Sequence, residues 1–213
     1  MSTVDETTAA ATDRHLAIED RDGTRAYVAT ISRTYPTTTV DLWDAVTTPE
    51  RIRRWFTPVT GDLRPGGRYQ LEGNASGEVT ACDAPRSFAA TWEFGGGISW
   101  IAVRVDEADG GAKFTLEHTA HATEGSMEFW DTYGPGATGV GWDLGMLGLA
   151  LHLEKPEAPR SIEDEEAWAG SAEGRAFITA ASAAWGETSM AVGTPREAAL
   201  AAAERTTRFY TGS

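Results

Sequence analysis

The side chains of this sequence that could do chemistry are few, and the two histidines of the segment "HTAH", His118 and His121, are the most informative. The segment "KFTLEHTAH" alternates apolar and polar residues, which predicts a β-strand with Phe114, Leu116 and His118 on one face. His121, three residues further on, is then expected on the opposite face. Two interpretations stay open for His118: a hydrogen-bonded core histidine, or a polar group that orients an apolar ligand in a pocket.

Metal binding or catalysis would need further groups beside these histidines. A metal needs a third and usually a fourth ligand, and no spacing brings Cys82, Asp131 or Asp143 to them, so we expect no metal and no cofactor. The sequence shows no nucleophile elbow, no cysteine with a matching histidine and no carboxylate pair placed to differ in pKa. Glu117 and Asp143 flank the expected pocket only as single carboxylates. The sequence therefore leaves catalysis unassigned and favours a protein that is not an enzyme.

The glycine-rich segment "GPGATGVGWDLGMLGLALHL" raises a second question about ligands. Its start matches G-x-G-x-x-G, but it follows antiparallel strands and lies in no βαβ unit, which predicts a loop with glycine at positive φ instead of a dinucleotide site. The rest reads as a helix in which Gly141, Gly145 and Gly148 share one face, beside Trp142 and Met146. This glycine face allows either close packing or room for a ligand, and both remain open.

The elements that must position these residues follow from periodicity and caps. A strand is expected over 25–36, then two short helices that meet at "TTPE", with Thr38 before Asp41 and Thr48 before Pro49 as start signals. Alternating strands follow in "GGRYQLEG", "GEVTAC", "RSFAATWEF", "ISWIAVRV" and "DGGAKFTLEHTAH". After the glycine-rich helix, alanine-rich helices are expected near 161–169, 172–191 and 195–210. This order predicts an α+β fold in which the long helix covers a curved antiparallel sheet.

Composition excludes several classes of partner. With a net charge of -14, the 213-residue chain lacks the basic patches that nucleic acids and anionic membranes require. The glycine-rich helix is short for a membrane span and contains Asp143. A single cysteine and an N-terminus without a signal-peptide pattern predict a cytoplasmic protein.

Three patches resemble a known family: "VDLWDAVTTPERIRRWF", "RPGGRYQLEGNASGEV" and "GPGATGVGWDLGMLGLALHLEK". They are similar to the START-like, or SRPBCC, superfamily, and most of all to the branch named for the activator of the 90-kDa heat-shock-protein ATPase. The resemblance implies a helix-grip fold, a curved antiparallel sheet wrapped around the long helix, with a cavity that holds apolar ligands in many members. It implies a lead-in over 1–23, the START-like domain over 24–155 and a helical extension over 156–213.

The resemblance also implies candidate cavity-lining residues, although the family shares no catalytic motif: Trp55, Tyr69, Trp92, His118, Trp142 and Met146. A small hydrophobic or aromatic molecule is the expected ligand. The alternatives are an enzyme of the cyclase/aromatase or hydrolase kind that uses the same cavity, and a protein-interaction module like the co-chaperones. The short lead-in, without Trp or Asn, departs from the co-chaperones' N-terminal domain. The extension is expected to cover the cavity mouth, pack outside the sheet or form a homodimer interface.

Overall fold

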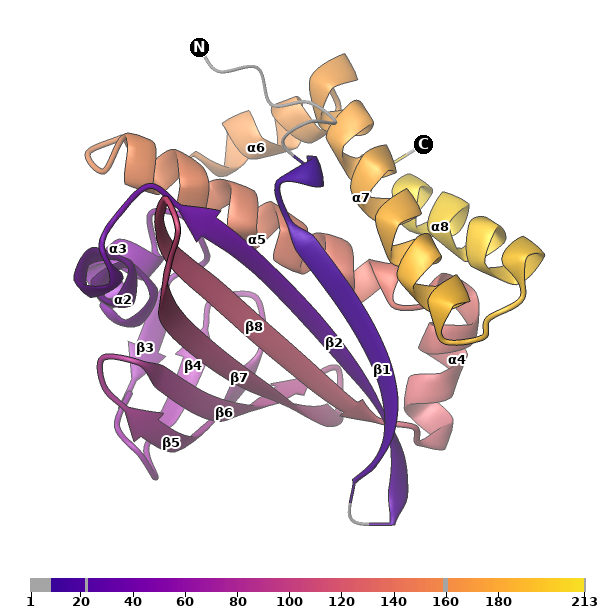
Figure 1. The fold of residues 1–213 in the computed structure, drawn as a ribbon, viewed down its shortest axis with the longest axis horizontal. Helices are drawn as coiled ribbons and strands as arrows, with labels where there is room; N and C mark the ends of the chain where they lie inside the picture. Colours follow the sequence, from indigo (N-terminus) through magenta and orange to yellow (C-terminus); the bar gives the residue numbers. More distant parts are fainter. Residues whose placement is uncertain (1–8, 22, 159–160, 213) are drawn as a thin grey trace. The chain divides into compact units, whose positions relative to one another are not determined.

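The structure, a computed structural model, describes residues 9–21, 23–158 and 161–212. These residues form two compact units. The first, called here the tail unit, contains 9–31, 122–144 and 161–212, and the second, the sheet unit, contains 32–121 and 145–158. The predicted fold class is confirmed: an eight-stranded antiparallel sheet in the order β1-β2-β8-β7-β6-β5-β4-β3, with long C-terminal helices (Figure 1).

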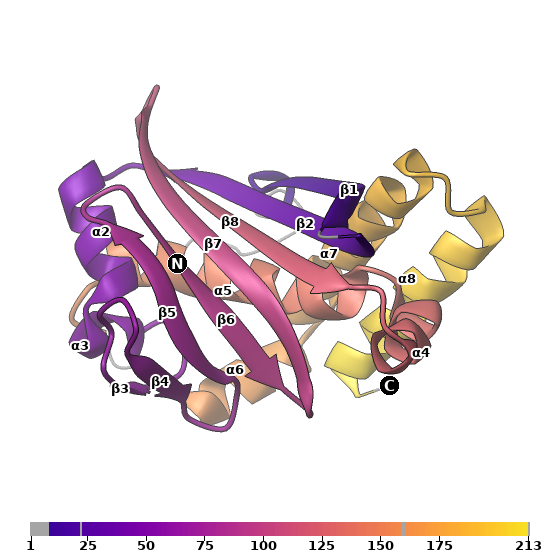
Figure 2. The ribbon, with the colours of Figure 1, turned by 90° about the horizontal axis from the view of Figure 1, so that it is seen from below.

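The sheet unit is built on a meander of hydrogen-bonded neighbours. Its strands are β3 (Val59–Gly61), β4 (Arg68–Leu71), β5 (Ser76–Asp83), β6 (Ser87–Phe94), β7 (Gly97–Ala108) and β8 (Gly111–His121). Each pairs antiparallel with the next, and the register shifts at a bulge between Val79 and Ala81. Figure 2 shows how strongly β5 to β8 twist and curve. The sequence predicted these strands except β3.

Two short helices precede the meander, as the start signals predicted. In α2 (Thr39–Thr47) the Thr38 hydroxyl accepts a hydrogen bond from the Asp41 amide at 3.2 Å, which confirms this cap. In α3 (Pro49–Ile52) Thr48 is the N-cap and proline opens the helix, but the Thr48 hydroxyl donates to the Asp44 carboxylate instead of capping. The turn of the chain into α3 therefore depends on proline more than on a side-chain cap.

The long helix α5 (Gly136–Glu154) starts in the tail unit and ends in the sheet unit, as β2 (Thr24–Tyr35) does. Its glycines mark close packing. A Cβ at Gly139 would lie 2.2 Å from Cε2 of Trp185, and one at Gly148 would lie 2.5 Å from the carbonyl oxygen of Trp55. At Gly145 the nearest atom would be at an ordinary 3.8 Å. Before the helix, Gly134 has a positive φ, 60°, as predicted, but Gly136 and Gly139, which were expected in the same loop, are already part of α5.

The tail unit contains β1 (Asp13–Arg21), α4 (Glu124–Tyr133), α6 (Ile162–Ala169), α7 (Ala172–Ala191) and α8 (Arg196–Thr211). The three predicted helices of the extension are present, and α7 packs on β1 and α8. Ser161 caps α6 through the Asp164 amide as predicted. Thr194 was predicted to cap α8, which is wrong: Pro195 is the N-cap, and the Thr194 hydroxyl accepts a hydrogen bond from Ser189.

Two elements of the tail unit were not predicted. Residues 13–21, within the expected lead-in, form β1, and its single buried apolar side chain, Leu16, leaves almost no alternation to recognise. Residues 1–8 lie outside the described part of the chain. Helix α4 was not predicted, although Met127, Trp130 and Tyr133 recur at helical spacing in "EGSMEFWDTYG". None of the helices described in the structure is long and apolar enough to cross a membrane.

Candidate functional site

The register of the sheet unit brings three predicted site residues to one face of the sheet. Residues directly opposite each other on neighbouring strands share a face. Trp92 pairs with Ser99, and Ile101 pairs with both Ala90 and His118. Tyr69 pairs with Gly77, two residues before Val79, which itself pairs with Ala90. Tyr69, Trp92 and His118 therefore lie on the same face, called here the inner face, and its other side chains are mostly apolar and buried.

His118 is the polar centre of the inner face. Its side chain is 8% exposed, and its Nε2 lies 2.8 Å from the Ser99 hydroxyl. Its ring contacts Trp92 edge-on, with 6.0 Å between centroids. Burial lowers the pKa of His118 to about 4, so the imidazole is neutral at pH 7. The Ser99 hydroxyl also lies 3.1 Å from the carbonyl oxygen of Trp92. When Ser99 donates to that carbonyl, it accepts from His118.

Tyr69 supplies a second polar group beside this apolar surface. Its hydroxyl donates to the Thr91 carbonyl at 2.6 Å. Burial raises the pKa of Tyr69 to about 12, with the charge of Glu93 adding to the effect, so the phenol stays neutral. A ligand on the inner face would meet two neutral polar side chains and no charged group among these predicted residues.

Met146 lies in the second half of α5, which belongs to the sheet unit, and Trp55 follows α3 in the chain. Met146 is buried, and the Tyr35 hydroxyl lies 3.0 Å from its carbonyl oxygen and 3.3 Å from its sulfur. The Trp55 indole donates to the Ala45 carbonyl at 2.9 Å, and its backbone packs against Gly148. Trp142, the sixth predicted residue, is partly exposed and belongs to the tail unit. The structure thus gathers five of the six candidates into one unit.

The other chemistry-bearing residues lie elsewhere. His121 is on the opposite face from His118, as predicted, with its ring 4.7 Å from that of Trp100. Glu117 pairs with Ala102 and is also on that outer face. Cys82 is exposed. Among the residues that the structure describes, no three His, Cys, Asp or Glu side chains are grouped so as to hold a metal ion.

Asp143 was expected to flank the pocket as a single carboxylate, but the tail unit buries it in an ion pair. Arg14 donates to it through Nη2 at 2.6 Å and Nε at 3.2 Å, and the Trp185 indole donates at 2.8 Å. Its carboxylate is therefore fully engaged in holding β1, α5 and α7 together. No local sequence pattern indicates these contacts, because Arg14 and Trp185 are 129 and 42 residues away from Asp143.

A polar cluster around Arg51 in the sheet unit was also missed. Arg51 pairs with Asp41 at 2.6 Å and Asp44 at 3.0 Å, and its Nε donates to Nε2 of His152 at 3.2 Å. Burial of His152, together with the nearby charge of Arg51, lowers its pKa. Burial alone would raise the pKa of Asp41, but hydrogen bonds from Thr37 and Arg51 hold it below its usual value. The cluster joins α2 and α3 to the end of α5, which is a structural role.

Comparisons with known proteins agree with this architecture. The family model described as activator of Hsp90 ATPase homolog 1-like protein matches residues 36–150, more than half of the chain. CalU16 from Micromonospora echinospora is 26% identical in both its crystal and solution structures, with TM-scores of 0.64 and 0.68. These alignments cover 86% and 91% of this chain and 99% and 100% of CalU16.

A more distant structure shares the fold alone. DynU16, described as a protein of the dynemicin biosynthetic locus, is 18% identical, with a TM-score of 0.52, over 63% of this chain and 49% of its own. Among curated proteins, none matches this chain significantly.

Proposed function

Because this chain belongs to the family of activator of Hsp90 ATPase homolog 1-like proteins, we propose that it binds a small apolar or aromatic molecule between the inner face of the sheet and the second half of α5. Trp92, Tyr69, Met146 and Trp55 supply apolar surface. The neutral His118 orients the ligand through one hydrogen bond. Apolar contact contributes most of the affinity, at roughly 25 cal/mol per Å² buried.

The observation that carries this proposal is the neutral, buried imidazole on an otherwise apolar face. The imidazole is buried among mostly apolar side chains, and the Ser99 hydroxyl lies within hydrogen-bond distance of it, so two polar groups meet on this face. With Ser99 donating to the Trp92 carbonyl and accepting from His118, the pair can accept a hydrogen bond from a ligand hydroxyl group. A few such groups in an apolar site are how proteins orient small ligands.

Binding is favoured over an enzymatic role by the same histidine. A general base works best with a pKa near the operating pH, and that of His118 is about 4. Two carboxylates were expected near the pocket. Asp143 is paired with Arg14, and Glu117 lies on the outer face of the sheet. His118 is therefore not matched to proton transfer at neutral pH.

The test is a titration with two matched probes, 1-naphthol and naphthalene, which differ by one hydroxyl group. The wild-type protein should bind 1-naphthol about tenfold more tightly, the value of one hydrogen bond. In His118→Leu this preference should vanish, while naphthalene affinity changes little. His121→Leu, on the outer face, is the matched control and should keep the preference. Failure of both probes to bind, or an unchanged preference in His118→Leu, would overturn the proposal.

A further inference from the structure

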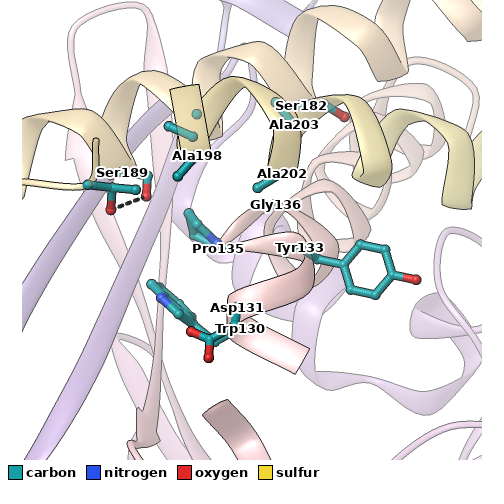
Figure 3. Close-up of a pocket in the computed structure, with 14 residues that line it drawn as sticks. Trp130, Asp131, Tyr133, Pro135, Gly136, Ser182, Ser189, Ala198, Ala202 and Ala203 are labelled. Atoms are coloured by element: carbon teal, nitrogen blue, oxygen red, sulfur yellow. Dashed lines mark hydrogen bonds between the residues drawn. The ribbon is translucent and has the colours of Figure 1, made fainter. Parts of the chain in front are cut away.

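The tail unit contains a pocket of about 140 Å³ that the proposed function does not use (Figure 3). The turn between α4 and α5 forms one side, and the facing surfaces of α7 and α8 form the other. Its lining is Trp130, Asp131, Tyr133, Gly134, Pro135, Gly136, Ser182, Gly186, Ser189, Thr194, Ala198, Ala199, Ala202 and Ala203. Alanine and glycine predominate on the helix walls, so the space comes from small side chains. A cavity of this size is smaller than a drug-sized site and takes a small molecule with a single ring.

One wall of the pocket holds a buried serine hydroxyl. Ser182 is 1% exposed, and its Oγ has no hydrogen-bond partner among the residues that the structure describes. Buried polar atoms are normally paired, and an unpaired one is costly. Ser182, Gly186 and Ser189 follow one face of α7 and span about 10 Å of helix. A polar group at the deep end of an elongated ligand would satisfy Ser182.

The charge of the pocket is negative. Asp131 is the only Asp, Glu, Lys, Arg or His in the lining, and it makes no ion pair with any residue of the described ranges. It lies in the last turn of α4, and Ser189 lies in the last turn of α7; neither turn contains a basic residue. The C-terminal end of a helix is its negative end. The N-terminus of α8 is the positive end of its helix dipole, and the negative charge of Glu197 in the first turn offsets it.

An aromatic surface completes the lining beside Asp131. The Trp130 indole stacks on Tyr27 with 3.7 Å between centroids and 19° between planes, so its orientation is fixed. An indole held in place next to a carboxylate attracts a cation, both through the charge and through the ring. Figure 3 shows Trp130 and Asp131 side by side at the edge of the pocket.

We propose that this pocket binds a small organic amine in its ammonium form, with a hydrogen-bonding group at its far end. The ammonium group pairs with Asp131 beside Trp130. The apolar body lies along the alanine and glycine surfaces of α7 and α8. The far polar group bonds to the hydroxyl of Ser182. This is a second site, in the tail unit, whose test is independent of the inner face of the sheet.

The experiment uses three probes that separate the two ends of such a ligand: tyramine, phenethylamine, which lacks the hydroxyl, and 4-ethylphenol, which lacks the ammonium. Isothermal titration of the full chain at pH 7 should give the tightest binding for tyramine. Because Asp131 is exposed, Asp131→Asn should weaken tyramine binding about threefold to fivefold and leave 4-ethylphenol unchanged. Glu187→Gln, an exposed carboxylate on α7 outside the lining, removes the same charge and should have no effect.

Ser182→Ala tests the deep end and is expected to fold normally, because the hydroxyl it removes has no partner among the described residues. It should reduce tyramine affinity to that of phenethylamine, with an unchanged melting temperature. Three results would overturn the proposal: no binding of either amine up to about 10 mM, equal losses in Asp131→Asn and Glu187→Gln, or tyramine affinity that survives both pocket substitutions. Naphthol binding, which tests the inner face, should be unaffected by either pocket variant.

Discussion

Arg14 and Asp143 form a buried, two-pronged ion pair across the tail unit, with side-chain exposures of 6% and 0%. Arg14 further donates to the carbonyl oxygens of Thr12 and Ala9, and Trp185 donates to Asp143. Both charges are therefore held by hydrogen-bonding groups inside the protein. Charges this deeply buried are tolerated only when they are paired and hydrogen-bonded.

Breaking this pair should destabilise the protein strongly. Asp143→Ala leaves the Arg14 guanidinium buried without its counter-charge, which costs about 3–5 kcal/mol of unfolding free energy. Urea denaturation followed by circular dichroism measures the loss. Glu19→Ala breaks an exposed pair with Arg21 on the same strand, β1, and should cost at most about 1 kcal/mol. Equal losses in the two variants would contradict the structural role given to Asp143.

Alanine substitutions at two glycines of α5 should change the stability of the protein in opposite directions. Gly139→Ala places a methyl group against the Trp185 ring, which must shift, so about 1–3 kcal/mol of stability should be lost. Gly145→Ala meets only ordinary contacts and gains helix propensity, so it should be neutral or stabilising by up to about 1 kcal/mol. Melting temperatures of the two variants give the comparison. Stabilisation by Gly139→Ala would show that α5 does not approach Trp185 so closely.

The buried neutral His118 predicts how stability depends on pH. The unfolded chain takes up this proton below about pH 6.5, the usual value, but the folded chain only below about pH 4. Between these values the unfolded state binds more protons, so the free energy of unfolding falls as the pH falls. From pH 7 to pH 5 the contribution is about 2 kcal/mol. His118→Leu should lose that part of the pH dependence, and His121→Leu should retain it, when urea midpoints are compared at both pH values. An identical pH dependence in His118→Leu would mean that this imidazole is not held neutral.

Much of the fold could be predicted because its signals are local. The period-two alternation of β6, β7 and β8 assigns Trp92 and His118 to the apolar face, and the observed register agrees. Caps at Thr38 and Ser161 mark helix starts within a few residues of sequence. The predictions failed where local signals are weak or misleading. Strand β1 has too little apolar alternation to be recognised, and the Thr194 hydroxyl accepts a hydrogen bond from Ser189 and does not cap α8.

The candidate site was only half predictable, because its hydrogen bonds join distant segments. His118 could be placed on the apolar face from sequence, but its partner Ser99 is set by the pairing of β7 with β8. From sequence, Asp143 was expected to be a single carboxylate, whereas in the structure it pairs with Arg14 of β1. The pocket at Ser182 and Asp131 depends on how α4, α7 and α8 pack, which no local pattern encodes.

The most direct test of the central claim is to observe the His118 imidazole while a ligand binds. The chain has four histidines, so protein labelled with ¹⁵N-histidine gives few ring signals, and His118→Leu assigns the relevant one by its loss. On titration with 1-naphthol at pH 7, the ring nitrogens of His118 should shift to saturation in the range of a neutral imidazole, while those of His121 stay in place. Saturable naphthol binding with an unmoved His118 signal, or no binding at all, would contradict the proposed site.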